Sequence, residues 1–267
     1  MSRAPRLGQH LLADPNLLDA IAREAELRPD DVVLEVGPGE GALTERLAPA
    51  VAHVHAIELD RRRFGEALGA VAAVAGNVEV TWGNAMRIDL AAIEPPPDKV
   101  VSNLPYSIAT PLILRTIEEL PSVDRWTLMV QREIADRLRA EPGGRVYGSP
   151  SVLVQLACEI RLLRPVGRRV FKPPPRVDSA LIALRRLGPA ARPELRTLVR
   201  EAFAHRRKSL ARSLELVAPS RRERVRAALE QIGLAADARA ESLAPEDFAR
   251  LAESLGSAIV PDGEPAE

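Results

Sequence analysis

Four consecutive residues near the middle of the chain, Asn103, Leu104, Pro105 and Tyr106, carry groups that could act together on one ligand. They follow the β-rich run 99–102, and ligands of α/β proteins bind at the carboxyl ends of strands. The proline fixes its own φ and disfavours helix at the residue before it, so the carbonyl groups of this turn point in fixed directions. Asn103 and the Leu104 backbone each offer a carbonyl oxygen, and Tyr106 offers a ring on which a base can stack.

Two acceptors beside a stacking ring suit an exocyclic amine on an aromatic base. Hydrogen bonds from that amine to both acceptors would favour a pyramidal nitrogen and localise its lone pair. Such a nitrogen could attack a methyl group in line. A strand, a proline turn and a helix with a core tyrosine give the same pattern, so the motif needs support from the rest of the chain.

A glycine-rich turn supplies that support. Residues 32–36 form a buried strand that runs directly into the turn, where the missing side chains allow a ligand to approach the backbone. Glu35 and Glu40 flank the turn; they would repel a pyrophosphate but suit the ammonium and sulfonium of S-adenosylmethionine. The glycines stand at Gly37, Gly39 and Gly41.

Two further polar residues extend the predicted cofactor site. Glu58 ends the next predicted strand, residues 53–58, and an acid at the end of the second strand typically bonds ribose hydroxyls. Asn84 follows the third predicted strand, residues 78–81, where a polar side chain would reach the adenine amine of the cofactor.

The order of elements predicts an α/β fold, a Rossmann-like sheet with a small all-helical C-terminal domain, and the cofactor site makes it a predicted S-adenosylmethionine-dependent methyltransferase sheet. Strands and helices alternate up to about residue 188, including a helix at 151–159 and a last strand at 179–184, which favours a mainly parallel doubly wound sheet. Four helices without strands follow, at 193–203, 207–217, 219–232 and 245–255. We therefore predict a methyltransferase domain at 1–188, a helical RNA-binding domain at 189–255 and a disordered tail at 256–267.

Composition excludes several classes of protein. The chain of 267 residues contains no apolar run of the 18 or more residues that a membrane span needs. Its N-terminus lacks the apolar stretch and cleavage site of a signal peptide. The single cysteine, Cys158, excludes an internal disulfide and a cysteine zinc cluster, and we predict no metal. These features predict a cytoplasmic, monomeric enzyme that does not contact membranes.

The net charge is zero, but the basic residues are unevenly distributed. Residues 161–186 contain eight Lys or Arg and one acid, and residues 192–226 contain eleven against four Glu. Local basic stretches matter more for binding a phosphate backbone than the total charge does, although a single charge run is usually a solvated face. The second stretch centres on Arg206, Arg207 and Lys208. In the first, prolines present Phe171, which is either a core residue or a second wall for a flipped base.

Taken together, the motifs resemble the small-subunit ribosomal RNA adenine dimethyltransferases, the kasugamycin-sensitivity methyltransferases, over roughly residues 6–255. The N-terminal, glycine-rich and catalytic motifs of that family are similar to LGQHLLADPNLL, VLEVGPGEGALT and SNLPYSIATPL. Its substrate loop is similar to VFKPPPRVDSAL, and its C-terminal signatures to AFAHRRKSLARSL and ARAESLAPEDFARLAESL. The last two are the most specific, because related large-subunit enzymes share the catalytic motif but differ in their C-terminal domains.

The resemblance implies transfer of methyl groups to N6 of two adjacent adenosines in a hairpin loop near the 3′ end of small-subunit (16S) rRNA, within a pre-assembled 30S particle. It implies that Asn103 and the Leu104 carbonyl hold the target amine, and that Tyr106 and Phe171 stack on the base. Asn84 stands where the family usually has Asp, so its contact with the adenine amine lacks charge assistance. The implied cofactor contacts are His10, the Leu12 backbone, Gly37, Glu58, Asn84 and Asn103.

Three alternatives remain at this point. The first is a large-subunit rRNA adenine N6-methyltransferase. The second is a non-catalytic assembly factor of the small subunit that retains a methyltransferase fold, although the intact glycine turn and Asn-Leu-Pro-Tyr motif favour an enzyme. The third is a nicotinamide-dependent oxidoreductase, which the glycine spacing and flanking acids disfavour.

Overall fold

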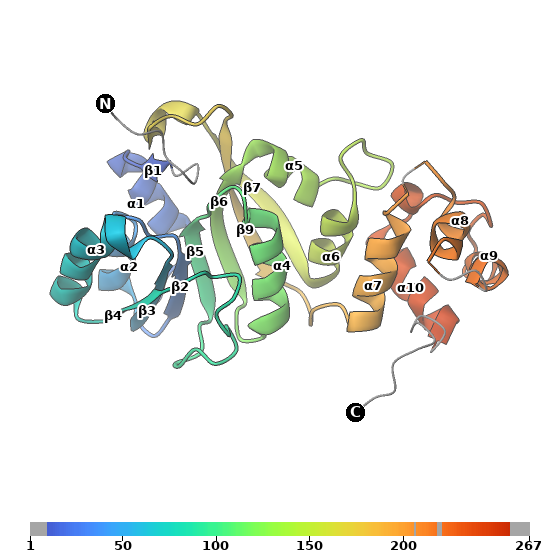
Figure 1. Ribbon diagram of the computed structural model, residues 1–267, viewed down its shortest axis with the longest axis horizontal. Helices are drawn as coiled ribbons and strands as arrows, with labels where there is room; N and C mark the ends of the chain where they lie inside the picture. Colours follow the sequence, from blue (N-terminus) through green and yellow to red (C-terminus); the bar gives the residue numbers. More distant parts are fainter. Residues whose placement is uncertain (1–9, 206, 218–220, 257–267) are drawn as a thin grey trace. The chain divides into compact units, whose positions relative to one another are not determined.

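The computed structural model describes residues 10–205, 207–217 and 221–256. The chain folds into two compact units (Figure 1). The first comprises Met1–Ala135 and Cys158–Leu187, and the second comprises Asp136–Ala157 and Gly188–Glu267. The chain thus enters the second unit twice. Residues 136–157, which we had predicted within a continuous first domain, belong to the helical unit. The predicted tail at 256–267 lies outside the described residues except for Gly256.

A seven-stranded sheet forms the centre of the first unit, in the order β4-β3-β2-β5-β6-β9-β7. The first five of these strands are parallel, and β9 runs antiparallel to both of its neighbours. This order confirms the predicted Rossmann-like α/β fold. The strands are β2 (Val32–Val36), β3 (His53–Glu58), β4 (Val78–Trp82), β5 (Lys99–Asn103), β6 (Arg125–Gln131), β7 (Cys158–Val166) and β9 (Ser179–Arg186).

The central strands form where buried β-branched and aliphatic residues cluster, as at Val33 and Leu34 of β2, because helices cover the sheet on both faces. The helix before β2 shows how local signals set its start: the Asp14 side chain accepts a hydrogen bond from Leu17 N at 3.0 Å, and Pro15 is the first helical residue. Its predicted apolar face, including Leu18 and Ile21, is buried. The helices of this part are α1 (Pro15–Glu24), α2 (Thr44–Leu47), α3 (Arg61–Ala75) and α4 (Ala109–Glu119), with 3₁₀ turns at Ala48–Ala50 and Arg168–Val170. The boundary between the units, after Ala135, falls within α5 (Arg132–Leu138).

A second, two-stranded sheet pairs distant parts of the chain. Strand β1 (Leu11–Leu12) runs antiparallel to β8 (Phe171–Lys172), with Leu12 opposite Phe171. The N-terminal segment is thereby fixed to the proline-rich loop.

The second unit contains α6 (Ser149–Ala157), α7 (Pro193–Ala202), α8 (Leu210–Glu215), α9 (Arg221–Gln231) and α10 (Pro245–Leu255), with a 3₁₀ turn at Ala240–Ser242. Tyr147 is fully buried there, donates a hydrogen bond to Leu243 O at 2.9 Å, and meets the Phe203 ring edge-on at 5.8 Å. The four predicted C-terminal helices are present. Helix α8 begins later than predicted, where the Ser209 side chain caps it. Within the described ranges, none of the helices combines the length and apolar character that crossing a membrane requires.

Candidate functional site

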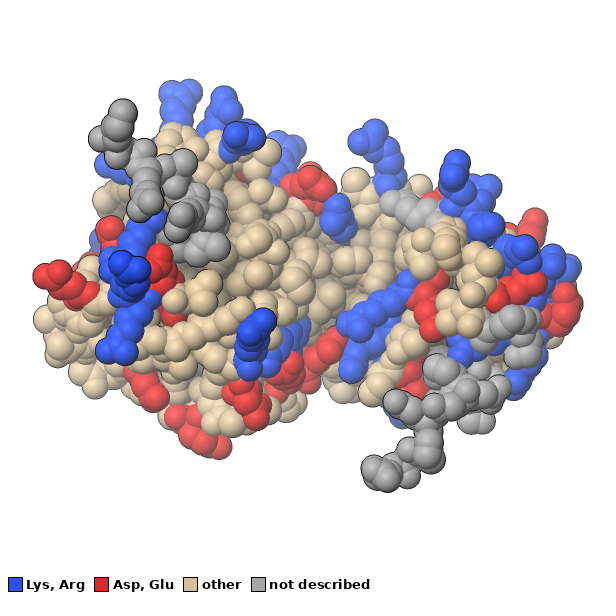
Figure 2. Space-filling model, viewed as in Figure 1, with Lys and Arg blue, Asp and Glu red and all other residues tan. Residues whose placement is uncertain are grey.

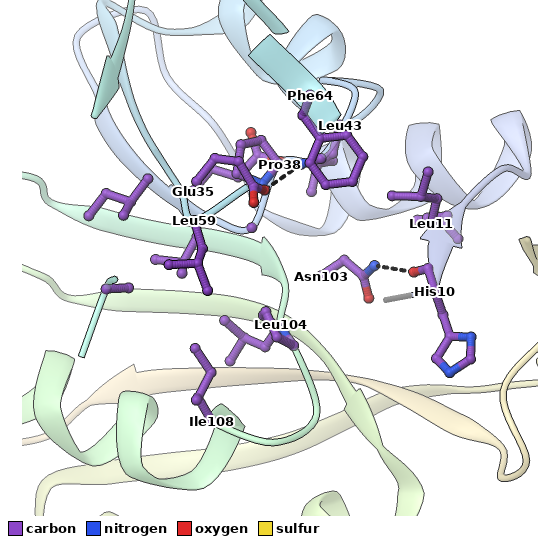
Figure 3. A pocket seen from close by; sticks show the side chains of 18 of the residues that line it. His10, Leu11, Glu35, Pro38, Leu43, Leu59, Phe64, Asn103, Leu104 and Ile108 are labelled. Carbon is purple, nitrogen blue, oxygen red and sulfur yellow. Dashed lines mark hydrogen bonds between the residues drawn. The ribbon is translucent and has the colours of Figure 1, made fainter. Parts of the chain in front are cut away.

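A cavity of about 280 Å³ lies at the carboxyl ends of the parallel strands of the first unit (Figure 3). Five segments line it: the glycine turn after β2, the end of β3, the residues after β4, the turn after β5, and β1. The structure therefore brings together most residues that the sequence predicted for one site. These are His10, Leu12, Gly37, Gly39, Glu58, Asn84, Asn103, Leu104, Pro105 and Tyr106.

The glycine turn needs its glycines for conformation and for space. Gly37 and Gly39 have φ of +76° and +59°, which favours glycine. A Cβ on Gly39 would lie 2.8 Å from Leu11 Cδ2, and one on Gly37 would lie 3.2 Å from Pro105 Cγ. Gly41 differs, because it does not line the cavity and a Cβ there would meet Val71 Cγ2 of α3 at 3.0 Å. We therefore assign Gly41 to packing, in place of the predicted cofactor contact.

Glu58 connects the ends of β3 and β2. Its Oε2 accepts a hydrogen bond from Gly39 N at 3.1 Å, and its Oε1 accepts one from Asp60 N at 2.8 Å. The residue is only 4% exposed. Since each carboxylate oxygen can accept a second hydrogen bond, Glu58 can still bind ligand hydroxyls from this fixed position.

Glu35 is a second buried acid at the same cavity. Its Oε2 accepts a hydrogen bond from the Thr44 hydroxyl at 2.6 Å. Burial raises the pKa of Glu35 to about 8; the Thr44 hydrogen bond opposes the rise and the negative charge of Glu58 adds to it. Two interacting carboxyl groups in a buried cavity favour a positively charged ligand, and together with the space left by Gly37 and Gly39 they fit S-adenosylmethionine.

The Asn103 side chain is oriented by the edge of β1. Its Nδ2 donates to His10 O at 3.4 Å, which leaves Oδ1 as an acceptor for a ligand (Figure 3). The following turn is fixed by backbone hydrogen bonds from Leu104 N to Met129 O and from Ile108 N to Pro105 O, both 3.1 Å. The acceptors that the sequence predicted are therefore held in place before any ligand binds.

The Tyr106 ring also occupies a fixed position. Its hydroxyl and the Ser179 hydroxyl are hydrogen-bonded at 2.7 Å. Burial raises the pKa of Tyr106, against the effect of the Ser179 bond, so the phenol stays neutral at physiological pH. The His10 ring lies 5.9 Å from the Tyr106 ring, centroid to centroid, and its Nδ1 donates to Pro173 O at 2.7 Å.

Phe171 is not part of this cavity. It is 1% exposed and packs in the hydrophobic core with Leu12, Val166 and Leu181. Of the two roles that the sequence left open for Phe171, the structure therefore supports a core residue and not a second wall that stacks on a base. The aromatic neighbour of Tyr106 is His10, which the sequence had indicated only as a cofactor contact.

The loop after β4 is held by contacts that the sequence did not reveal. Asn84 Oδ1 accepts from Met86 N at 2.9 Å, so the amide caps its own turn. From α4, the Arg115 guanidinium donates to Ala85 O and Ile88 O while pairing with Glu119. In the sequence, Arg115 looks like any arginine on a helix surface. It positions the loop that carries Asn84.

Lys and Arg side chains gather over the second unit, with acids between them (Figure 2). Three of the four Glu residues of the stretch 192–226 already pair with other arginines: Glu201 with Arg221, Glu215 with Arg212, and Glu223 with Arg226. Among the residues that the structure describes, Arg207 and Lys208 are exposed and form no ion pair. Arg206 lies outside them. This surface therefore has basic groups that local acids do not neutralise.

Comparison with known proteins agrees with the geometry. Residues 2–257 match the family model described as "Ribosomal RNA adenine dimethylase". A ribosomal RNA small subunit methyltransferase A from Rubrobacter xylanophilus is 46% identical over 92% of this chain and 92% of its own length. One from Thermosynechococcus vestitus is 42% identical over 94% of this chain and 96% of its own.

Two solved structures share the fold over both units. A dimethyladenosine transferase from Plasmodium falciparum has a TM-score of 0.79 at 29% identity, covering 92% of this chain and 97% of its own. The 23S rRNA methyltransferase ErmE has a TM-score of 0.65 at 33% identity, covering 92% and 99%.

Proposed function

The chain belongs to the ribosomal RNA adenine dimethylase family, and we propose that it transfers methyl groups from S-adenosylmethionine to N6 of two adjacent adenosines near the 3′ end of small-subunit rRNA. The family model and the small-subunit relatives, which are 41–46% identical over most of the chain, favour the small subunit as substrate. In fold, the chain is also more similar to the dimethyladenosine transferase than to the large-subunit enzyme ErmE, with TM-scores of 0.79 and 0.65. We propose that it acts as a cytoplasmic monomer on a pre-assembled 30S particle.

One observation carries the proposal. The Asn103–Tyr106 turn and the glycine turn line the same cavity, so a methyl donor and a target amine can meet there. A cofactor-binding fold without methyltransferase activity would need no fixed pair of acceptors beside the donor site.

The cofactor supplies a methyl group activated by its sulfonium charge. We assign its binding to the buried acids Glu35 and Glu58, which lie where a positively charged ligand would be bound, and to Gly37 and Gly39, which leave room against the backbone. Asn84 and the His10–Leu12 segment complete the lining.

Asn103 Oδ1 and the Leu104 carbonyl are the acceptors for the target amine. Hydrogen bonds to them strengthen as the amine becomes pyramidal, and interactions that strengthen on the way to the transition state lower the barrier. Tyr106 orients the base by stacking, which contributes about 1–3 kcal/mol per base. Its ring is suited to this because the Ser179 hydrogen bond fixes it at the cavity.

The basic surface of the second unit serves a different purpose. Arg207 and Lys208 are exposed and without acidic partners among the described residues, so they are available for RNA phosphates. Phosphate contacts position an RNA without reading its sequence. The cavity then selects the target adenosine, and Arg207 and Lys208 contribute to the affinity for the RNA.

The deciding experiment maps N6,N6-dimethyladenosine in rRNA from cells with and without this protein, and in isolated small and large subunits incubated with labelled S-adenosylmethionine. We expect label at two adjacent adenosines of small-subunit rRNA alone. Label in the large subunit would identify the large-subunit alternative, and tight subunit binding without label would identify an assembly factor.

A variant pair tests the base-binding assignment. Tyr106→Leu removes the ring and should reduce RNA methylation while leaving cofactor affinity unchanged, as measured by calorimetry. Tyr106→Phe keeps the ring and loses only the hydrogen bond to Ser179, so it should retain most of the activity. Equal losses in both variants would show that the hydroxyl, not stacking, is what matters.

A further inference from the structure

Three side chains of the first unit form a cluster of metal-ligating groups that methyl transfer does not use: His53, His55 and Glu79. None of them lines the cavity. His53 is the first residue of β3, at the opposite end of the strand from Glu58. His55 shares its face of the strand two residues later, and Glu79 is its register partner on β4.

The potential ligand atoms face one another across a gap. His53 Nε2 lies 3.7 Å and His55 Nδ1 lies 3.9 Å from the same Glu79 Oε2, and all of these atoms lie within 4.8 Å of one another. These separations are too long for hydrogen bonds. Two ligands bound tetrahedrally to zinc at about 2.0–2.2 Å stand roughly 3.4 Å apart, so a bound ion would shorten each histidine–Glu79 separation by roughly 0.5 Å or less.

A hydrogen bond made by the other ring nitrogen of His55 fixes the tautomer that a metal ion requires. His55 Nε2 donates to Pro95 O at 2.8 Å, which leaves Nδ1 unprotonated and directed at the cluster. Metal-bound histidines usually donate their other ring N–H to a carbonyl or carboxylate in this way.

The second histidine of the cluster, His53, has a ring nitrogen that lacks a partner. This atom is buried and has no hydrogen-bond partner. A buried nitrogen without a partner is uncommon in folded proteins and calls for a ligand such as a water or an ion.

We propose that His53, His55 and Glu79 form a three-ligand site for a divalent transition-metal ion, with Zn²⁺ as the first candidate. Two imidazoles and one carboxylate suit Zn²⁺, whereas Ca²⁺ and Mg²⁺ prefer oxygen ligands. The Glu79 side chain is 60% exposed, so the site opens to solvent and leaves a fourth position for water. The ion connects β3 to β4 and, through His55, to the Pro95 loop; it is structural and takes no part in methyl transfer.

The test titrates the untagged full-length protein, freed of metal by a chelator, with Co²⁺ and then displaces Co²⁺ with Zn²⁺. We expect one equivalent of Co²⁺ with the visible absorption of a four-coordinate nitrogen and oxygen site. Thermal unfolding should shift upward by about 5 °C at a hundredfold excess of Zn²⁺ over its Kd.

Two single variants and a matched control locate the site. Glu79→Gln and His53→Gln should each weaken Zn²⁺ binding at least about tenfold, and His205→Gln, which changes an exposed histidine of the second unit, should not. Because Glu79 is largely exposed, its variant folds even if His53→Gln does not. Cofactor affinity should stay unchanged in all three. Zn²⁺ affinity that is unmoved by Glu79→Gln, or an absence of Co²⁺ absorption, would overturn the proposal.

Discussion

Replacing Glu35 by Gln should change how the stability of the protein depends on pH. The pKa of this carboxyl is about 8 in the folded protein against 4.5 when it is free in solution. Between these two pH values the Glu35 carboxyl is protonated in the folded state and ionised in the unfolded state. The contribution of Glu35 to stability is therefore complete below about pH 4.5 and is lost as the pH rises through about 8. The slope is about 1.4 kcal/mol per pH unit.

Gln cannot ionise, and its amide oxygen can still accept the Thr44 hydrogen bond. The difference in unfolding free energy between Glu35→Gln and the wild type should therefore grow in favour of the variant by up to about 3 kcal/mol from pH 5.5 to 7.5. Taking the difference between the two proteins cancels the titration of all other groups.

Urea unfolding followed by tryptophan fluorescence measures this difference. Both tryptophans, Trp82 and Trp126, lie in the first unit, so the signal reports the unit that contains Glu35. Glu40→Gln, at an exposed position of the same turn, serves as the control and should follow the wild type at every pH. A difference between Glu35→Gln and wild type that stays constant over this range would refute the reasoning.

Three further predictions concern binding and chemistry. Glu58→Gln leaves one of the two backbone N–H groups facing an amide NH₂ and should weaken S-adenosylmethionine binding by about 1.5–3 kcal/mol in calorimetry, and unchanged affinity would contradict its assignment. Asn103→Ala should slow single turnover by about 10²–10³-fold at saturating cofactor and RNA, by analogy with losing one oxyanion donor; a near-normal rate would exclude it from the chemistry. Arg207→Gln with Lys208→Gln should lower the salt slope of subunit binding by about 1.4, at about 0.7 per contact with single strands, and an unchanged slope would return both residues to a solvated face.

The parts of the fold that the sequence predicted are those with strong local signals. The strands β2, β3 and β5 are buried along most of their length, and each has β-branched or aliphatic residues at its centre. Helix α1 carries its N-cap and first-turn proline in consecutive residues. For the same reason the turns that follow these strands, with their glycines and prolines, identified most of the cavity lining.

The parts that were missed depend on tertiary partners. Strand β7 exposes most of its residues at the sheet edge and includes Arg161 and Arg164, so it lacks the apolar pattern by which a strand is recognised. The predicted helix 151–159 accordingly extended into it. Phe171 was ambiguous because its surroundings in sequence are basic and proline-rich, while its burial comes from pairing with Leu12, far away in the chain.

The metal-ligand cluster was missed for a related reason. The His-x-His spacing of His53 and His55 is visible in the sequence, but their third partner, Glu79, comes from another strand and is fixed only by register. The carbonyl that orients His55 belongs to Pro95, in a loop without any local signal for this role.

The two buried acids of the cavity place stability and function in opposition. Glu35 and Glu58 lie near the carboxyl ends of neighbouring parallel strands. Burial, and to a smaller extent the charge of Glu58, raises the pKa of Glu35, so this acid destabilises the folded protein as the pH rises. S-adenosylmethionine carries an ammonium and a sulfonium, and positive charges nearby favour Glu35 in its ionised form. Methyl transfer removes the sulfonium charge, so the acids attract the product less strongly than the cofactor. In the cofactor-binding role that we propose for these acids, an arrangement that costs stability in the empty protein would favour exchange of spent cofactor for fresh cofactor, which two successive methylations of one adenosine require.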